Sequence, residues 1–183
     1  MTTGFTYTDF DSESCSIART AHLLGDPWTV LIVRDLRNGV HRFDELARHL
    51  GIARSVLTRR LTALVDRGLV ERAEYREPGR RARSEYRLTA LGRDLGVVLS
   101  ALMQFGDRHL DHGQGPPVVP RHAGCGAPIR LVTECSAGHR IGAGDSVDIE
   151  AGPGARPRAD LDPDPDSDPD CDTDTDTPGG DTP

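Results

Sequence analysis

Residues 42–72 have the sequence RFDELARHLGIARSVLTRRLTALVDRGLVER. Apolar residues recur at helical spacing on both sides of Gly51, and glycine commonly ends a helix. The second of these two segments is rich in arginine, and the chain after Gly68 has the residue types of a strand. The order of helix, tight turn, helix and strand predicts a helix-turn-helix that continues directly into a wing.

Periodicity and end signals extend this pattern in both directions. Asp26 and Pro27 are typical of a helix start, and Thr89 opens a long amphipathic segment. Pro78-Gly79 predicts the turn of a hairpin. The predicted helices cover residues 16–24, 27–36, 44–50, 54–67 and 89–110, and the predicted strands cover residues 69–75 and 84–88. The fold class is therefore α+β but mainly α, a winged helix-turn-helix with a two-stranded wing and a long C-terminal helix.

The charge of the chain differs by region. The formal net charge is −7, but residues 160–183 alone hold ten aspartates and no basic residue. Residues 1–159 carry 22 arginines and 19 acidic residues, a net charge of +3. Residues 40–93 carry 13 arginines and 7 acidic residues, a net charge of +6. The positive charge thus lies on the helix-turn-helix, where neutralisation of DNA phosphates requires it.

Composition divides the chain into four segments. Residues 1–14 are an N-terminal extension, residues 15–112 are patterned as a globular domain, and residues 113–150 are rich in Gly, Cys and His. Residues 151–183 have almost no apolar side chain to bury, so we expect a disordered acidic tail that keeps the protein soluble or competes with DNA for the basic helix. There is no export signal and no apolar run long enough to cross a bilayer, which predicts a cytoplasmic protein without a membrane partner.

The arginine-rich helix and the hairpin carry the residue types that contact double-stranded DNA. Short polar side chains let a helix backbone approach the major groove, and arginine reaches base edges or phosphates. Arginines of the hairpin tip can reach a minor groove or the backbone. The predicted DNA contacts are Arg42, Arg54, Ser55, Thr58, Arg59, Arg60, Thr62, Arg80, Arg81 and Arg83.

Residues 15–110 resemble the HxlR family of winged helix-turn-helix transcriptional regulators. The resemblance is carried by Cys15 before the first helix, by the block GDPWTVLIVRDLRNGVHRFDELARHLGIARSVLTRRLTALVDRGLVER and by EYRLTALG. It implies a homodimer formed by the first and last helices, and a repressor that binds a pseudo-palindromic operator. Phe105 departs from the pattern, because the family usually has Trp in the last helix. It keeps an aromatic side chain for the same interface.

Cys15 lies where family members often have a cysteine that senses oxidants or electrophiles. A thiol at a helix N-terminus gains thiolate character. The acidic neighbours Asp9, Asp11 and Glu13 are expected to raise its pKa instead. Cys15 is therefore either a sensor of a small electrophile or oxidant, or a small residue packed at the dimer interface.

A second cysteine pattern occurs in the segment RHAGCGAPIRLVTECSAGHR. His122 and Cys125 form one pair, and Cys135 and His139 form another. Two such pairs on a short hairpin could bind a tetrahedral zinc ion. The alternative is a metal-free hairpin packed on the domain.

Catalysis is not expected. The histidines are scattered, and the chain lacks the phosphate-binding, metalloprotease and nucleophile motifs that would indicate an enzyme. The sequence therefore predicts a DNA-binding transcriptional regulator. The alternative is a winged-helix module that binds another protein and not DNA.

Overall fold

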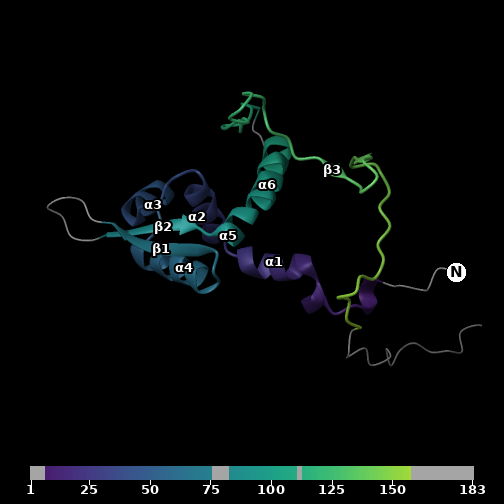
Figure 1. The fold of residues 1–183 in the computed structure, drawn as a ribbon, viewed down its shortest axis with the longest axis horizontal. Helices are drawn as coiled ribbons and strands as arrows, with labels where there is room; N and C mark the ends of the chain where they lie inside the picture. The colour runs from purple at the N-terminus through teal and green to yellow at the C-terminus, as the bar shows by residue number, and fades with distance from the viewer. Residues whose placement is uncertain (1–6, 76–82, 111–112, 158–183) are drawn as a thin grey trace, which may run out of the picture. The chain divides into compact units, whose positions relative to one another are not determined.

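A computed structural model describes residues 7–75, 83–110 and 113–157. The described residues fall into two compact units, one within residues 22–146 and one that joins residues 7–21 to residues 147–157. The larger unit contains the helix-turn-helix and the wing (Figure 1). No helix in the described part of the chain is both long and apolar enough to cross a membrane.

Three helices form the helix-turn-helix and its support: α2 (Pro27–Arg37), α3 (Phe43–Leu50) and α4 (Arg54–Asp66). Asp26 caps α2, because its Oδ1 accepts hydrogen bonds from the backbone N–H groups of Trp28 at 2.9 Å and Thr29 at 3.3 Å. Gly51 ends α3 in the left-handed conformation at φ 62°, which glycine adopts without strain. The turn that the sequence predicts between the two helices is therefore present.

The wing is an antiparallel hairpin of β1 (Val70–Tyr75) and β2 (Arg83–Leu88), in which Val70 pairs with Leu88 and Tyr75 with Arg83. Arg42 adds an isolated bridge to Glu85 on the other edge of β2. Figure 1 shows the hairpin among α2, α3 and α4. The wing is thus connected directly to the residue that precedes α3.

One core joins these elements. Leu46 of α3 is completely buried, and so is Leu57 of α4. Burial of one such side chain contributes roughly 1.5–3 kcal/mol, so this core fixes how α4 is oriented. The buried hydrophobic residues are Ile32, Val33, Leu36, Leu46, Ile52, Leu57, Leu61, Leu64, Leu69, Val70, Tyr86, Leu88 and Leu95.

The long helix predicted for residues 89–110 is two helices, α5 (Ala90–Asp94) and α6 (Gly96–His109), which corrects the prediction. Thr89 caps α5 by accepting a hydrogen bond from the Gly92 N–H at 3.1 Å. A Cβ at Gly92 would overlap the backbone carbonyl of Leu69, and one at Gly96 would overlap the guanidinium of Arg37. The two glycines lie on either side of the break at Leu95, and periodicity alone carries no sign of such tertiary contacts.

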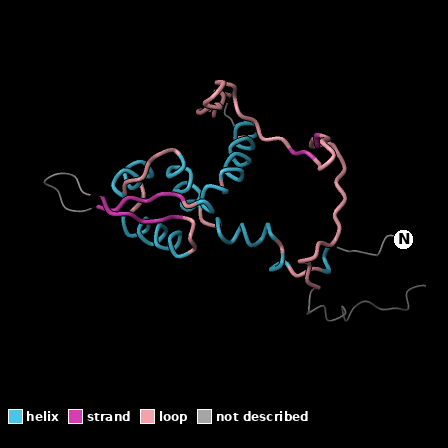
Figure 2. Tube along the Cα trace, viewed as in Figure 1, coloured by secondary structure: helices cyan, strands magenta, loops and turns pink. Residues whose placement is uncertain are grey.

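Beyond α6 the described chain is mainly loop (Figure 2). It contains a small hairpin of β3 (Thr133–Glu134) and β4 (Arg140–Ile141). The amide of Gln104 attaches this segment to α6: its Nε2 donates to the Leu131 carbonyl and its Oε1 accepts from the Leu131 N–H, both at 3.1 Å. Most of the tail that the sequence predicts to be disordered, residues 158–183, lies outside the described residues.

The first helix, α1 (Ser16–Leu24), has the bounds that the sequence predicts. It follows two short 3-10 helices, η1 (Tyr7–Asp9) and η2 (Ser12–Ser14). In the smaller unit the backbone N–H of Asp11 donates to the carbonyl of Arg156 at 3.0 Å, and Phe10 forms an isolated bridge with Pro157. The residues before α1 are thus paired with the chain beyond residue 147.

Candidate nucleic-acid interface

The outward face of α4 is polar along its length. Leu57, Leu61 and Leu64 turn into the core, and Thr58, Arg59 and Thr62 face solvent. Four predicted DNA contacts are exposed together on this outward face: Ser55, Thr58, Arg59 and Thr62. Within the described chain, Arg59 has no hydrogen-bond or ion-pair partner. Its guanidinium is therefore available to an external acceptor.

Arg60 departs from the expected role. Its Nη2 donates to Oδ2 of Asp26 in an ion pair, and both side chains are partly buried. Arg60 is three residues after Leu57 and four before Leu64, so the spacing already placed it on the inner flank of the helix. Its side chain attaches α4 to the start of α2 and does not point outward with Arg59.

Arg54, at the start of α4, pairs with Asp44 of α3. Its Nη1 lies 2.7 Å from Oδ1 of Asp44, and its guanidinium carbon lies 4.8 Å from the centre of the Phe43 ring. Arg83 of β2 reaches the other carboxylate oxygen of Asp44 at 3.7 Å. One carboxylate therefore contacts arginines from the start of α4 and from the first residue of β2.

Arg42, the residue before α3, belongs to the same cluster. Its guanidinium carbon lies 4.7 Å from the centre of the Tyr75 ring, and its Nη1 lies 3.9 Å from Oε1 of Glu45. A groove runs between the start of α3 and the end of the wing at which Tyr75 pairs with Arg83. We call it the arginine groove; its lining residues are Arg42, Phe43, Asp44, Glu45, Arg48, Arg54, Tyr75, Arg83 and Ser84.

The pKa of Asp44 lies below its ordinary value, because Arg54 donates a hydrogen bond to its carboxylate and nearby arginines add a favourable charge interaction. Asp44 is therefore ionised at neutral pH. Sequence reasoning did not single out Asp44, Arg48 or Tyr75, because these residues meet only through the packing of α3 on the wing.

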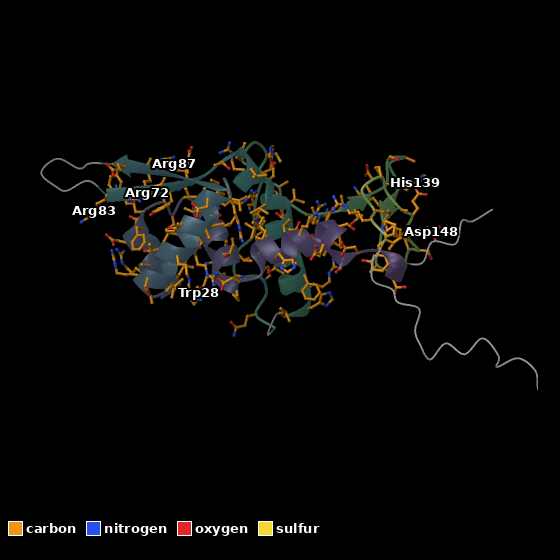
Figure 3. The ribbon with its side chains drawn as sticks, turned by 90° about the horizontal axis from the view of Figure 1, so that it is seen from below. Trp28, Arg72, Arg83, Arg87, His139 and Asp148 are labelled. Atoms are coloured by element: carbon orange, nitrogen blue, oxygen red, sulfur yellow. The ribbon has the colours of Figure 1, made fainter. Side chains whose placement is uncertain are left out.

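The wing carries further arginines. Figure 3 shows Arg72, Arg83 and Arg87 on the hairpin. Arg72 donates from Nε to Oγ of Ser84 at 2.9 Å, and Arg87 pairs with Glu85 at 2.5 Å. Arg80 and Arg81, two of the predicted contacts, lie outside the described residues.

A buried carboxylate supports the helix-turn-helix from behind. Asp35 of α2 is 2% exposed, and its two oxygens contact Arg34 Nε at 2.8 Å and His49 Nδ1 at 2.7 Å. His49 lies in the last turn of α3. This network connects α2 and α3. The sequence indicates it only through the helical spacing that places Asp35 among apolar residues.

Cys15 lies directly before α1. Its pKa is below the ordinary value, mainly because the backbone N–H groups of Ala18 and Ile17 hydrogen-bond to the sulfur, with smaller effects of Tyr7 and Arg19. The expectation that acidic neighbours would raise this pKa is therefore wrong. The helix N-terminus outweighs them, because its donors contact the sulfur directly.

The Cys and His residues of the C-terminal segment form two separate pairs. His122 Nδ1 lies 3.3 Å from Cys125 Sγ, and Cys135 Sγ lies 3.6 Å from His139 Nδ1. No three His, Cys, Asp or Glu side chains of the described chain are grouped to hold a metal. The pKa of Cys135 is lowered, mainly by hydrogen bonds from the His139 and Ala137 backbone. The zinc site stays a prediction.

Comparison with known proteins identifies the family to which this architecture belongs. A family model described as HxlR-like helix-turn-helix matches residues 23–114. A protein of Mycobacterium tuberculosis described as an HTH-type transcriptional regulator is 43% identical over 149 residues, which covers 80% of this chain and 91% of that protein.

Two solved structures support the same fold. PA1607, described as a transcription factor, matches with a TM-score of 0.66 and 32% identity over 75% of this chain and 96% of its own. PA1374 of Pseudomonas aeruginosa matches with a TM-score of 0.53 and 39% identity over 78% and 95% of the two chains. The chain belongs to the HxlR-like helix-turn-helix family, whose members are transcriptional regulators and not enzymes.

Proposed function

We propose that this regulator binds duplex DNA in a sequence-specific manner, with the outward face of α4 in the major groove and the wing on the flanking backbone. The observation that carries this proposal is the row of exposed Ser55, Thr58, Arg59 and Thr62 on a helix fixed by the core. An α-helix with its side chains is about 10–12 Å wide, which fits the major groove. Arg59 is the side chain that we expect to read a base edge or bind a phosphate.

We infer that the DNA-binding form is a homodimer. Large apolar side chains remain exposed on the first and last helices: Ile17 is 77% exposed, Leu102 is 50% exposed and Phe105 is 59% exposed. A second copy that covers these side chains would remove apolar surface from water. A two-fold dimer requires a pseudo-palindromic site with half-sites about one helical turn apart. Repression follows if this site overlaps a promoter.

The test compares Arg59→Ala with Arg130→Ala by fluorescence anisotropy on the DNA upstream of the gene. Both variants lose one exposed arginine, and Arg130 lies in the loop segment after α6. Arg59→Ala should weaken specific binding about tenfold or more if it contacts a base. If it contacts a phosphate, the salt dependence should become shallower by about one unit per protomer. Arg130→Ala should bind as the parent does.

The same titration separates the alternative function. Binding that weakens steeply as salt rises supports a DNA-binding regulator. Absence of binding to any duplex would favour a winged-helix module that recognises another protein.

We further propose that Cys15 controls DNA binding by reacting with an oxidant or electrophile. Its lowered pKa favours the thiolate, which is the form that reacts with oxidants and electrophiles. Diamide or a quinone should reduce the affinity of the parent protein for DNA and leave Cys15→Ser unaffected. An equal loss in both proteins would reject this role.

Zinc binding by His122, Cys125, Cys135 and His139 is a separate proposal. Its support is the formation of both pairs on one short segment. Protein purified without chelator should contain about one zinc ion per chain, and Cys125→Ser should remove it. Protein without zinc would instead support a metal-free segment.

A further inference from the structure

The arginine groove gathers positive side chains from three separate parts of the domain. Arg42 comes from the residue before α3, Arg54 from the start of α4 and Arg83 from the first residue of β2. Arg48 of α3 also lines it. The groove therefore lies where the helix-turn-helix meets the wing, between the two elements that the proposed function places on DNA.

Asp44 occupies the centre of this cluster. Its two oxygens contact different arginines, Oδ1 with Arg54 at 2.7 Å and Oδ2 with Arg83 at 3.7 Å. A phosphodiester offers guanidinium groups the same arrangement, two anionic oxygens on one centre. The carboxylate thus satisfies the arginines in the way that a backbone phosphate would.

The pairs with Asp44 are exchangeable because they are exposed. The side chain of Arg54 is 69% exposed, that of Arg83 is 47% exposed and that of Asp44 is 44% exposed. Ion pairs at such exposed sites contribute little to stability. Contacts with phosphate gain additional free energy from the release of counterions. An incoming phosphate can therefore replace the carboxylate at little cost.

We propose that the arginine groove binds a phosphate of the DNA backbone, and that Asp44 occupies it as an internal competitor in the free protein. This inference rests on the proposed DNA-binding function. Phosphate contacts carry no sequence information directly. Asp44 therefore lowers the affinity for specific and non-specific duplexes to a similar extent and keeps the groove from holding arbitrary DNA.

The test compares the intact parent protein with Asp44→Asn and Glu45→Gln on a random-sequence duplex about three helical turns long. Both substitutions remove one negative charge from the first turn of α3, so they change net charge and the helix-dipole interaction alike. Among the described acidic residues, Asp44 alone contacts both Arg54 and Arg83. Glu45 lies 3.9 Å from Arg42, another arginine of the groove, so Glu45→Gln should raise the affinity less than Asp44→Asn does. Thermal unfolding of each variant shows that it is folded before binding is measured.

Asp44→Asn should bind about fivefold tighter per protomer at low salt, the equivalent of about 1 kcal/mol. The slope of log affinity against log salt should be steeper by about one unit per protomer. Adding Arg54→Gln to Asp44→Asn should remove the gain. Equal gains for Asp44→Asn and Glu45→Gln would overturn the proposal, because they would reflect net charge alone. Unchanged or weaker binding by folded Asp44→Asn would also overturn it.

These outcomes are distinguishable from failure of the proposed function. If the parent protein binds duplex DNA with a steep salt dependence and Asp44→Asn does not differ from it, only the role of Asp44 is rejected. If neither protein binds any duplex at low salt, DNA binding itself is rejected, and the role of Asp44 is rejected with it.

Discussion

Nδ1 of His49 lies 2.7 Å from Oδ2 of Asp35, which joins an exposed ring in the last turn of α3 to a buried carboxylate in α2. The other carboxylate oxygen accepts from Arg34. A carboxylate that is 2% exposed is stable only when its oxygens have donors. The position of α3 relative to α2 therefore depends on a polar contact as well as on the burial of Leu46.

Asp35→Ala should lower the free energy of unfolding by about 1–3 kcal/mol, because it removes the hydrogen bonds that the buried carboxylate accepts from Arg34 and His49. His49→Ala should cost less, since Arg34 still pairs with Asp35. His22 is an exposed histidine of α1, and His22→Ala should change stability by less than about 0.5 kcal/mol. Urea unfolding measures all three. Equal effects of the two histidine variants would contradict a supporting role for His49.

Gly92→Ala should destabilise the domain by about 1–3 kcal/mol, because the new Cβ would meet the backbone carbonyl of Leu69, which cannot move without disturbing the core. Gly106→Ala is the matched control in α6, where nothing lies within 4 Å of the added atom. That substitution should stabilise the helix by about 0.5–1 kcal/mol. Thermal unfolding compares them, and a neutral Gly92→Ala would mean that α5 can shift away from Leu69.

Phe105→Asp should convert the proposed dimer into a monomer, because it places a charge on the exposed apolar side of α6. Light scattering coupled to size-exclusion chromatography gives the mass directly. Val118→Asp is the control, since Val118 is similarly exposed, at 66%, but lies in the loop after α6. A variant Phe105→Asp with the parent's mass would reject the interface, and a monomeric parent would reject the dimer.

The rate of alkylation of Cys15 by iodoacetamide should rise with pH at a midpoint below that of an ordinary thiol. The thiolate reacts, and its pKa is lowered by the backbone donors at the start of α1. At a pH below the ordinary pKa of a thiol, Cys15 is therefore a thiolate in a larger fraction of the folded protein than of the unfolded chain. The measurement uses a variant whose one cysteine is Cys15, compared with an unstructured peptide of residues 12–19. Equal midpoints would contradict the effect of the helix.

The elements that local chemistry dictates were predictable from the sequence. The start of α2 follows from Asp26 and Pro27, and its bounds match the prediction within one residue. The end of α3 follows from Gly51, which can adopt the left-handed conformation. The outward face of α4 follows from the spacing of its leucines. In each case, the residues that predict the feature lie next to it in the sequence.

The features that depend on distant partners were not predictable in the same way. Residues 89–110 form two helices, and Gly92 and Gly96 on either side of the break pack against residues far away in the sequence, which periodicity does not show. Arg60 was expected on DNA; its spacing from Leu57 and Leu64 indicates the inner flank of α4, but the partner that it meets there, Asp26 of another helix, does not follow from spacing. The arginine groove exists only because α3 packs against the wing, so its residues share no motif.

Asp26 has a consequence for the thermodynamics of binding. One of its oxygens caps α2, and the other accepts from Arg60 of α4. The tilt of α4 is therefore fixed by the same side chain that caps its supporting helix, α2. The conformational entropy of orienting α4 is lost during folding and not at the encounter with a partner, which leaves more of the contact energy for affinity.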